Sequence, residues 1–117
     1  FIKPPITHGG NHNNNDWSQN FDKLKSDILC VKDEFDIALL SCGGYGMITS
    51  DYIYSKLNKS CIYVGGALQL FFGIMGNRWV NNYDIESFNW KKNTNWCRPL
   101  KSDIPKNHIY VEGGSYC

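Results

Sequence analysis

The feature that most limits the fold of this chain is an apolar run that ends on glycines, "DIALLSCGGYG" at Asp36–Gly46. A short, continuous apolar run bounded by glycines is typical of a parallel strand that is buried on both faces. Glycines directly after such a strand let the backbone turn sharply into a helix. The pattern recurs at residues 60–66, "SCIYVGG", so we expect two parallel strands, each ending on a glycine turn.

The segments around these strands predict helices. Asp16 and Gln19 have the spacing of a capping box, which predicts the start of an amphipathic helix. Apolar residues then recur at one-turn spacing: Trp17, Phe21, Leu24 and Ile28. Residues 47–57 predict a second helix, and residues 67–74, apolar on every side, predict a buried helix or helical turn. The alternation of strands and helices favours an α/β fold, a parallel sheet with flanking helices.

The two ends of the chain have a different composition. Residues 1–15 hold two prolines, two glycines and four asparagines, which predicts a loop or arm. We expect residues 16–117 to form a single α/β domain, small or partial, because 117 residues suffice for one core. Periodicity weakens after residue 75, where the pattern predicts a surface loop, a short helix at 85–88 and a strand at 109–112. The chain starts with Phe1, which leaves open that it is the C-terminal part of a longer protein.

Charge and composition exclude some functions. The net charge is +1 without a long basic block, so we expect no nucleic-acid partner. The longest apolar run falls well short of the roughly 20 residues that a membrane span needs. The number of cysteines is odd and none form a CxxC pair, which favours reduced thiols in the cytoplasm over a disulfide framework. The cysteines are Cys30, Cys42, Cys61, Cys97 and Cys117.

The candidate binding site is the sheet edge onto which both glycine turns would open. Carboxyl ends of neighbouring parallel strands meet at one edge, where ligands of open α/β sheets bind. Backbone N–H groups without a covering side chain can approach an anion there. Turns with a purely structural role remain the alternative, because "GGYG" matches neither a dinucleotide fingerprint nor a P-loop. The candidate residues of these turns are Gly43, Gly44, Tyr45, Gly46, Gly65 and Gly66.

Three further residues are candidates for ligand binding. Gln69 is polar within an apolar segment, so it either hydrogen-bonds backbone in the core or meets the ligand. Arg78 and Trp79 suit binding of a phosphate or carboxylate together with stacking on a ring, and the alternative is an arginine stacked on an exposed tryptophan without a ligand. No metal site is predicted, since His8 and His12 lie in a coil that does not place them on one face.

Three segments of the chain resemble a known family. They are "FDIALLSCGGYGMITSDYI", "IYVGGALQLFFGIMGNRW" and "RPLKSDIPKNHIYVEGGSYC", of which the second is the most specific. The family is poorly characterised, occurs in bacteria and giant DNA viruses, is tied to cell-surface or capsid glycan synthesis, and resembles GT-D-type glycosyltransferases. The resemblance implies a Rossmann-like sheet, a sugar nucleotide or glycan as ligand, and a location in a host cytoplasm or a virion. The matching motif positions are Gly43, Gly44, Gly65, Gly66, Gln69, Arg78 and Trp79.

One departure from the family bears on catalysis. GT-D enzymes carry an early acidic DxE motif that positions a divalent metal such as Mn²⁺ and the donor, and no such motif precedes Asp36. Asp84 and Glu86 form a DxE triplet, but in a later region. Two functions therefore stay open. One is a glycosyltransferase-like enzyme with an unknown cofactor, and the other is a non-catalytic domain that binds a glycan or a protein partner, such as a viral structural or assembly component.

Overall fold

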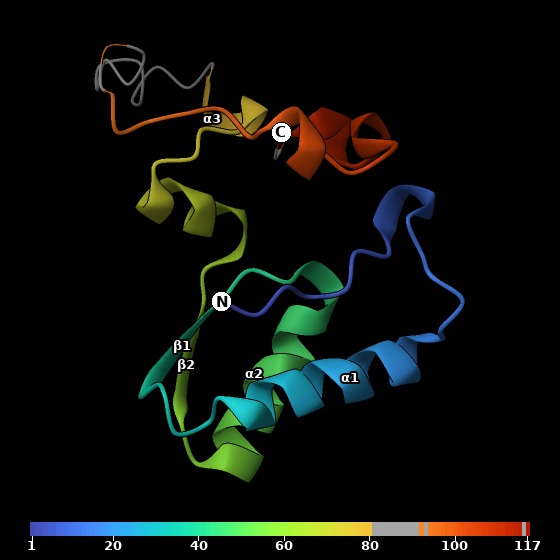
Figure 1. Ribbon diagram of the computed structural model, residues 1–117, viewed down its shortest axis with the longest axis vertical. Coiled ribbons are helices and arrows are strands. Elements are labelled where there is room, and N and C mark those ends of the chain that lie inside the picture. The colour runs from blue at the N-terminus through green and yellow to red at the C-terminus, as the bar shows by residue number, and fades with distance from the viewer. Residues whose placement is uncertain (81–91, 93, 116) are drawn as a thin grey trace. The chain divides into compact units, whose positions relative to one another are not determined.

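The computed structural model describes residues 1–80, 92, 94–115 and 117, and the chain divides into two compact units (Figure 1). Unit 1 comprises Phe1–Ile6 and His12–Leu68, and unit 2 comprises Thr7–Asn11 and Gln69–Cys117. Within the described ranges, no helix combines the length and the apolar character that crossing a membrane would require.

Unit 1 is built on a βαβ arrangement, as Figure 1 shows. Strands β1 (Ile37–Leu40) and β2 (Ser60–Tyr63) pair in parallel, and helix α2 (Gly46–Leu57) connects them. The predicted pair of parallel strands joined by a helix, and the mixed α/β class, are thus confirmed. The sheet has two strands in the part of the chain that the structure describes, so the Rossmann-like fold stays a prediction.

Helix α1 (Trp17–Cys30) precedes the first strand and begins at the predicted capping box. The backbone N–H of Gln19 donates to Oδ1 of Asp16 at 2.8 Å, and the backbone N–H of Asp16 donates to Oε1 of Gln19 at 2.9 Å. Two backbone donors that the first turn would leave without a partner are thereby satisfied, which fixes where the helix starts.

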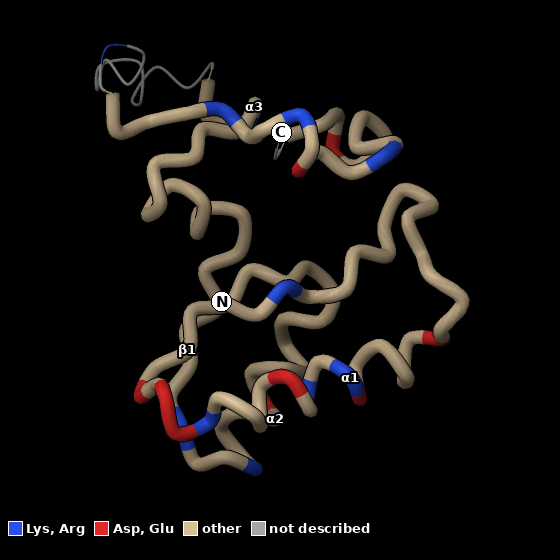
Figure 2. Tube along the Cα trace, in the orientation of Figure 1, with Lys and Arg blue, Asp and Glu red and all other residues tan. Residues whose placement is uncertain are grey.

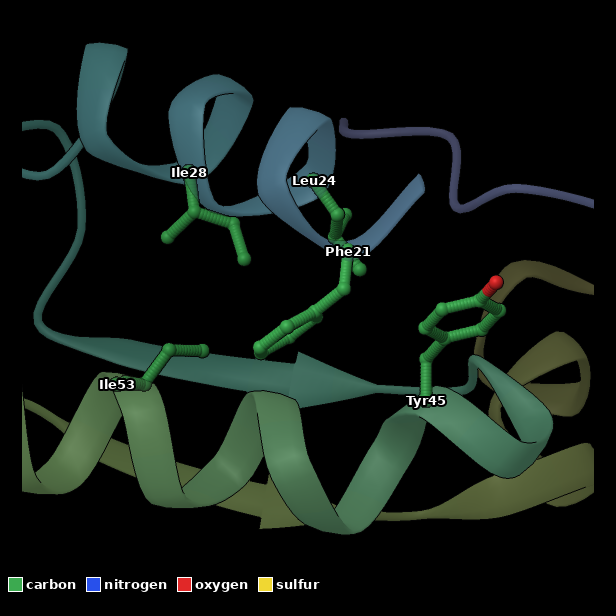
Figure 3. Packing of buried hydrophobic residues seen from close by; sticks show 5 residues of the cluster. All are labelled: Phe21, Leu24, Ile28, Tyr45 and Ile53. Atoms are coloured by element: carbon green, nitrogen blue, oxygen red, sulfur yellow. The ribbon is translucent and has the colours of Figure 1, made fainter. Parts of the chain in front are cut away.

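The core of unit 1 lies where α1 and α2 pack against the sheet. Figure 3 shows its five buried side chains, Phe21, Leu24, Ile28, Tyr45 and Ile53. From the strands, the half-buried Ala38, Leu40 and Cys61 pack against this cluster. Removing such side chains from water contributes roughly 1.5–3 kcal/mol for each large one, so this cluster is the main source of stability for unit 1.

The opposite face of the strand pair is exposed, contrary to the prediction of a strand buried on both faces. The exposed fractions are 55% for Ile37, 47% for Leu39 and 53% for Ile62. Successive side chains of a strand point to opposite faces, and α1 and α2 contact the face that carries Ala38 and Leu40. The apolar run is continuous, but in the described structure only every second residue of it is covered.

Residues 65–72 form the 3₁₀ helix η3 (Gly65–Phe72), where the sequence predicts a buried helix over 67–74. The helical prediction is confirmed in a tighter form. The prediction of burial is wrong, because none of these residues is fully buried and Phe71 and Phe72 are exposed. A segment that is apolar all round does not by itself indicate which side will be covered.

Unit 2 contains the one-turn helix α3 (Asn77–Val80) and three 3₁₀ turns, η5 (Lys101–Asp103), η6 (His108–Tyr110) and η7 (Glu112–Gly114). The predicted strand at 109–112 is therefore wrong. Asn107 and Gly113 have φ of +57° and +64°, left-handed values that interrupt an extended chain on both sides of this segment. The predicted helix at 85–88 lies outside the described residues.

Hydrogen bonds between distant segments hold unit 2 together. The backbone N–H of Met75 donates to the carbonyl of Cys97 at 2.8 Å, and that of Cys97 donates to the carbonyl of Gly73 at the same distance. The guanidinium of Arg98 donates to the carbonyl of Cys117 at 2.8 Å and to Oδ1 of Asn77. These contacts join three stretches that the sequence separates by about twenty residues each.

Leu24 and Leu29 lie on the same helix and allow a matched test of the core. Replacing the buried Leu24 by alanine should lower the free energy of unfolding by about 2–5 kcal/mol, because it leaves a cavity between α1 and the sheet. The same change at the exposed Leu29 should cost less than about 0.5 kcal/mol. Urea denaturation followed by circular dichroism measures both, and equal losses would contradict this assignment of the core.

Candidate functional site

The carboxyl ends of β1 and β2 form one edge, and a glycine turn follows each strand there. Leu40 lies beside Tyr63 in the register, so the two strands end side by side. After β1, the 3₁₀ turn η2 (Gly43–Tyr45) runs directly into α2, and after β2 the chain enters η3 at Gly65. Gly43 and Gly65 have φ of +51° and +64°, a left-handed conformation that favours glycine. The structure thus brings the two predicted turns together.

The backbone at Gly43 and Gly44 is open to solvent. A Cβ atom added to either residue would find no other heavy atom within 4 Å. Both residues are exposed, and α2 begins two residues after Gly44. This is the part of the edge where another molecule could approach the main chain most closely.

Gly46 has a different role from its neighbours. A Cβ atom there would lie 2.6 Å from Cδ2 of Tyr63 and closer still to Cε2. The aromatic ring therefore occupies the space that a side chain at position 46 would need. Gly46 is required by packing within the protein, and this role is independent of any ligand.

Tyr63 itself is a residue of this edge that the sequence analysis missed. Its ring contacts Gly46, Cε1 lies 3.8 Å from the Cβ position of Gly65, and its hydroxyl donates to the carbonyl of Gly43 at 3.4 Å. The residue is nevertheless 46% exposed. An aromatic residue two positions before a glycine at the end of a strand was the available signal.

Tyr45, predicted among the ligand-binding residues, lies in the core. Its ring stacks on Trp17 with 5.7 Å between the centroids, and Trp17 in turn stacks on Phe21 at 5.4 Å. Figure 3 shows Tyr45 as a member of the buried cluster, at the start of α2. Its buried hydroxyl has no hydrogen-bond partner among the residues that the structure describes.

Cys42 precedes the first glycine turn and is half-buried. Burial raises the pKa of its thiol, and the nearby Thr49 hydroxyl lowers that pKa in part, although their contact falls short of ordinary hydrogen-bond geometry. A raised pKa keeps the sulfur protonated near neutral pH, where a thiol is a poor nucleophile. Cys42 is therefore suited to packing rather than to covalent catalysis.

The remaining predicted residues belong to unit 2. Arg78 forms an ion pair with Glu112, so its charge is already partnered within the protein. Nε2 of Gln69 and Nε1 of Trp79 are buried, and neither has an acceptor within the described ranges. The structure thus places the six glycine-turn residues in unit 1 and the three side-chain candidates in unit 2.

Charge is absent from the segments that form the edge. Residues 41–50 and 60–68 contain no Lys, Arg, Asp or Glu, and Figure 2 draws both segments in tan. An anion would therefore be held by backbone N–H groups and by the start of α2, whose dipole is equivalent to roughly half a positive charge. These segments also supply no carboxylate or histidine that could act as a general base.

Metal-binding groups do not gather in the described part of the chain. No three His, Cys, Asp or Glu side chains lie together there in a way that could hold an ion. The DxE triplet at Asp84 and Glu86 lies outside the described residues.

Comparison of the chain with protein-family models, with curated proteins and with solved structures finds no match in any of the three.

Gly44 and Gly46 provide a matched test of the edge. Gly46→Ala should lower the free energy of unfolding by about 1–3 kcal/mol, because the new methyl group overlaps the ring of Tyr63. Gly44→Ala should be neutral or slightly stabilising, since the methyl group enters open space. When Tyr63 is also replaced by alanine, Gly46→Ala should lower the free energy of unfolding by less, because the ring that the methyl group overlaps is gone. Thermal and urea denaturation measure these four variants and the unmodified protein, and an unchanged cost of Gly46→Ala in the Tyr63→Ala background would contradict the contact.

Cysteine labelling tests the surroundings of Cys42. Iodoacetamide at pH 8 should modify the exposed Cys30 well before Cys42, because burial both shields the Cys42 thiol and raises its pKa. A raised pKa stabilises the folded state below the thiol's ordinary pKa, and this contribution is lost as the pH rises through the folded-state value. Peptide mass spectrometry follows the labelling. In urea, Cys30 and Cys42 should be labelled at equal rates. Equal labelling rates in the folded protein would contradict the burial of Cys42.

Proposed function

We propose that this chain is part of a glycosyltransferase-like protein of glycan synthesis and that the glycine edge of unit 1 binds a sugar nucleotide. Unit 1 would then be part of a Rossmann-like domain. The observation that carries the proposal is the uncovered backbone at Gly43 and Gly44. It lies at the carboxyl end of a parallel strand, at the start of a helix and beside a second glycine turn.

The diphosphate is the part of a sugar nucleotide that this edge suits best. The N–H groups of Tyr45 and Gly46 already donate to the carbonyls of Cys42 and Gly43, so the diphosphate charge would meet the remaining N–H groups of the turn and the dipole at the start of α2. Bare glycines would let the phosphate oxygens approach the main chain without steric hindrance. No carboxylate in residues 41–50 or 60–68 would repel them.

In glycosyl transfer, the role of these groups would be to stabilise the leaving diphosphate. Negative charge grows on the leaving group as the glycosidic bond breaks, and preorganised N–H donors stabilise such charge. The proposal assigns binding to the glycine turns and gives none of their residues a proton-transfer role. Arg78 is a weaker candidate for this task than the sequence predicts, because its ion pair with Glu112 would have to open first.

A second candidate function is non-catalytic binding of a protein partner. It is favoured by the exposed apolar face of the strand pair, made by Ile37, Leu39 and Ile62. Contiguous apolar surface of this kind is common at protein interfaces. Under this alternative, the glycine turns would serve only the local fold, and no nucleotide would bind.

Isothermal titration calorimetry with UDP-glucose and GDP-mannose, each with and without Mn²⁺, tests nucleotide binding. We expect saturable binding by the unmodified protein. Gly44→Gln should weaken this binding at least roughly tenfold, because the new side chain would fill the space through which the phosphates approach. A tenfold loss of affinity corresponds to about 1.4 kcal/mol of binding free energy.

Ser55→Gln is the matched control, because it adds the same side chain at an exposed position near the other end of α2. It should leave the affinity unchanged. Absence of heat with both donors, in either metal condition, would rule out donor binding by this chain and favour the second candidate.

A further inference from the structure

We infer that Tyr63 is the residue on which the nucleobase of the bound nucleotide stacks. The inference deepens the proposed function and rests on it. It concerns a side chain that comes from β2 and lies between the two glycine turns, and it names the base as the part of the ligand that Tyr63 would recognise.

The position of Tyr63 is fixed by its surroundings on three sides. Its ring fills the space beside Gly46, its Cε1 edge faces Gly65, and its hydroxyl points to the carbonyl of Gly43. Because Tyr63 and Cys61 are two residues apart in β2, they face the same side of the sheet, where Cys61 donates to the carbonyl of Ser50 in α2. The ring is thus held at the edge by packing, which lowers the entropy lost when a ligand stacks on it.

Packing within the protein does not account for all of this ring. Tyr63 as a residue is 46% exposed even though its ring is seated against Gly46. The hydroxyl makes a long hydrogen bond of 3.4 Å, which is weak and easily exchanged for a ligand acceptor. An aromatic surface that is fixed in place and partly open to solvent is suited to stacking on a planar ring.

Tyr63 also contacts the turn that forms the proposed phosphate site. Gly43, the residue that meets the tyrosine hydroxyl, is one of the two glycines with open backbone. A diphosphate held at this turn would therefore place its nucleoside within reach of Tyr63. With no charged side chain in these segments, stacking is the main source of selectivity for a nucleotide over a simple phosphate.

Tyr63→Leu and Tyr63→Phe separate stacking from packing. Leucine keeps an apolar side chain beside Gly46 but has no aromatic face, so affinity for both UDP and UDP-glucose should fall by roughly tenfold, in the range known for base stacking. Phenylalanine keeps the ring and should bind within about twofold of the unmodified protein, since stacking does not need the hydroxyl. Tyr54→Leu, on the exposed part of α2, is the matched control and should have no effect.

A direct measurement accompanies these affinities. In the complex of the unmodified protein with UDP, nuclear Overhauser effects should connect the ring protons of Tyr63 with H5 and H6 of uracil. This readout is independent of protein stability, so it separates stacking from a loss of affinity caused by partial unfolding of the Leu variant.

The outcomes distinguish this inference from the proposed function. If the unmodified protein binds neither UDP-glucose nor GDP-mannose, with or without Mn²⁺, both fail together. If it binds them but shows no contact between Tyr63 and uracil, or if Tyr63→Leu binds as tightly, the stacking role is overturned and the proposed function stands. A loss confined to UDP-glucose would assign Tyr63 to the sugar and would also overturn the inference.

Discussion

The rest of unit 1 depends on the packing of one face of the β1–β2 pair against α1 and α2. These helices have 14 and 12 residues, lengths at which an isolated helix is marginal in water. A parallel pair of two strands likewise has little stability without a covering layer. Phe21, Leu24 and Ile28 from one helix and Ile53 from the other bring these elements together, because burying these apolar side chains offsets the entropy lost in ordering the chain.

This packing also determines the geometry of the glycine edge. Once α2 lies on the sheet, its first residue meets the side chain of Tyr63, and only glycine leaves room for that contact. The neighbouring glycines have other roles. Gly43 and Gly65 adopt left-handed backbone conformations, whereas Gly44 borders open space. One short motif thus combines backbone geometry, internal packing and a free approach from solvent, and only the last of these concerns a ligand.

The local features of unit 1 were predictable from short stretches of sequence. The capping box of Asp16 and Gln19, the one-turn spacing in α1 and the two apolar runs depend on neighbouring residues, and all of them form as expected. The failures have a common cause. The strand expected at 109–112 has β-forming residues, but left-handed backbone at Asn107 and Gly113 turns the chain. Burial of both strand faces requires a second covering layer, which no local pattern can reveal.

In unit 1, the sequence alone determined which segments become helices and strands and where glycine turns follow the strands, because propensity, capping and periodicity act over a few residues. The tertiary structure decided how those segments are used. It placed Tyr45 in the core and Tyr63 at the edge, and it paired Arg78 with Glu112, 34 positions away. The physical reason is that burial, ring stacking and ion pairing depend on distances between residues remote in the chain, and those distances exist only after each unit has folded.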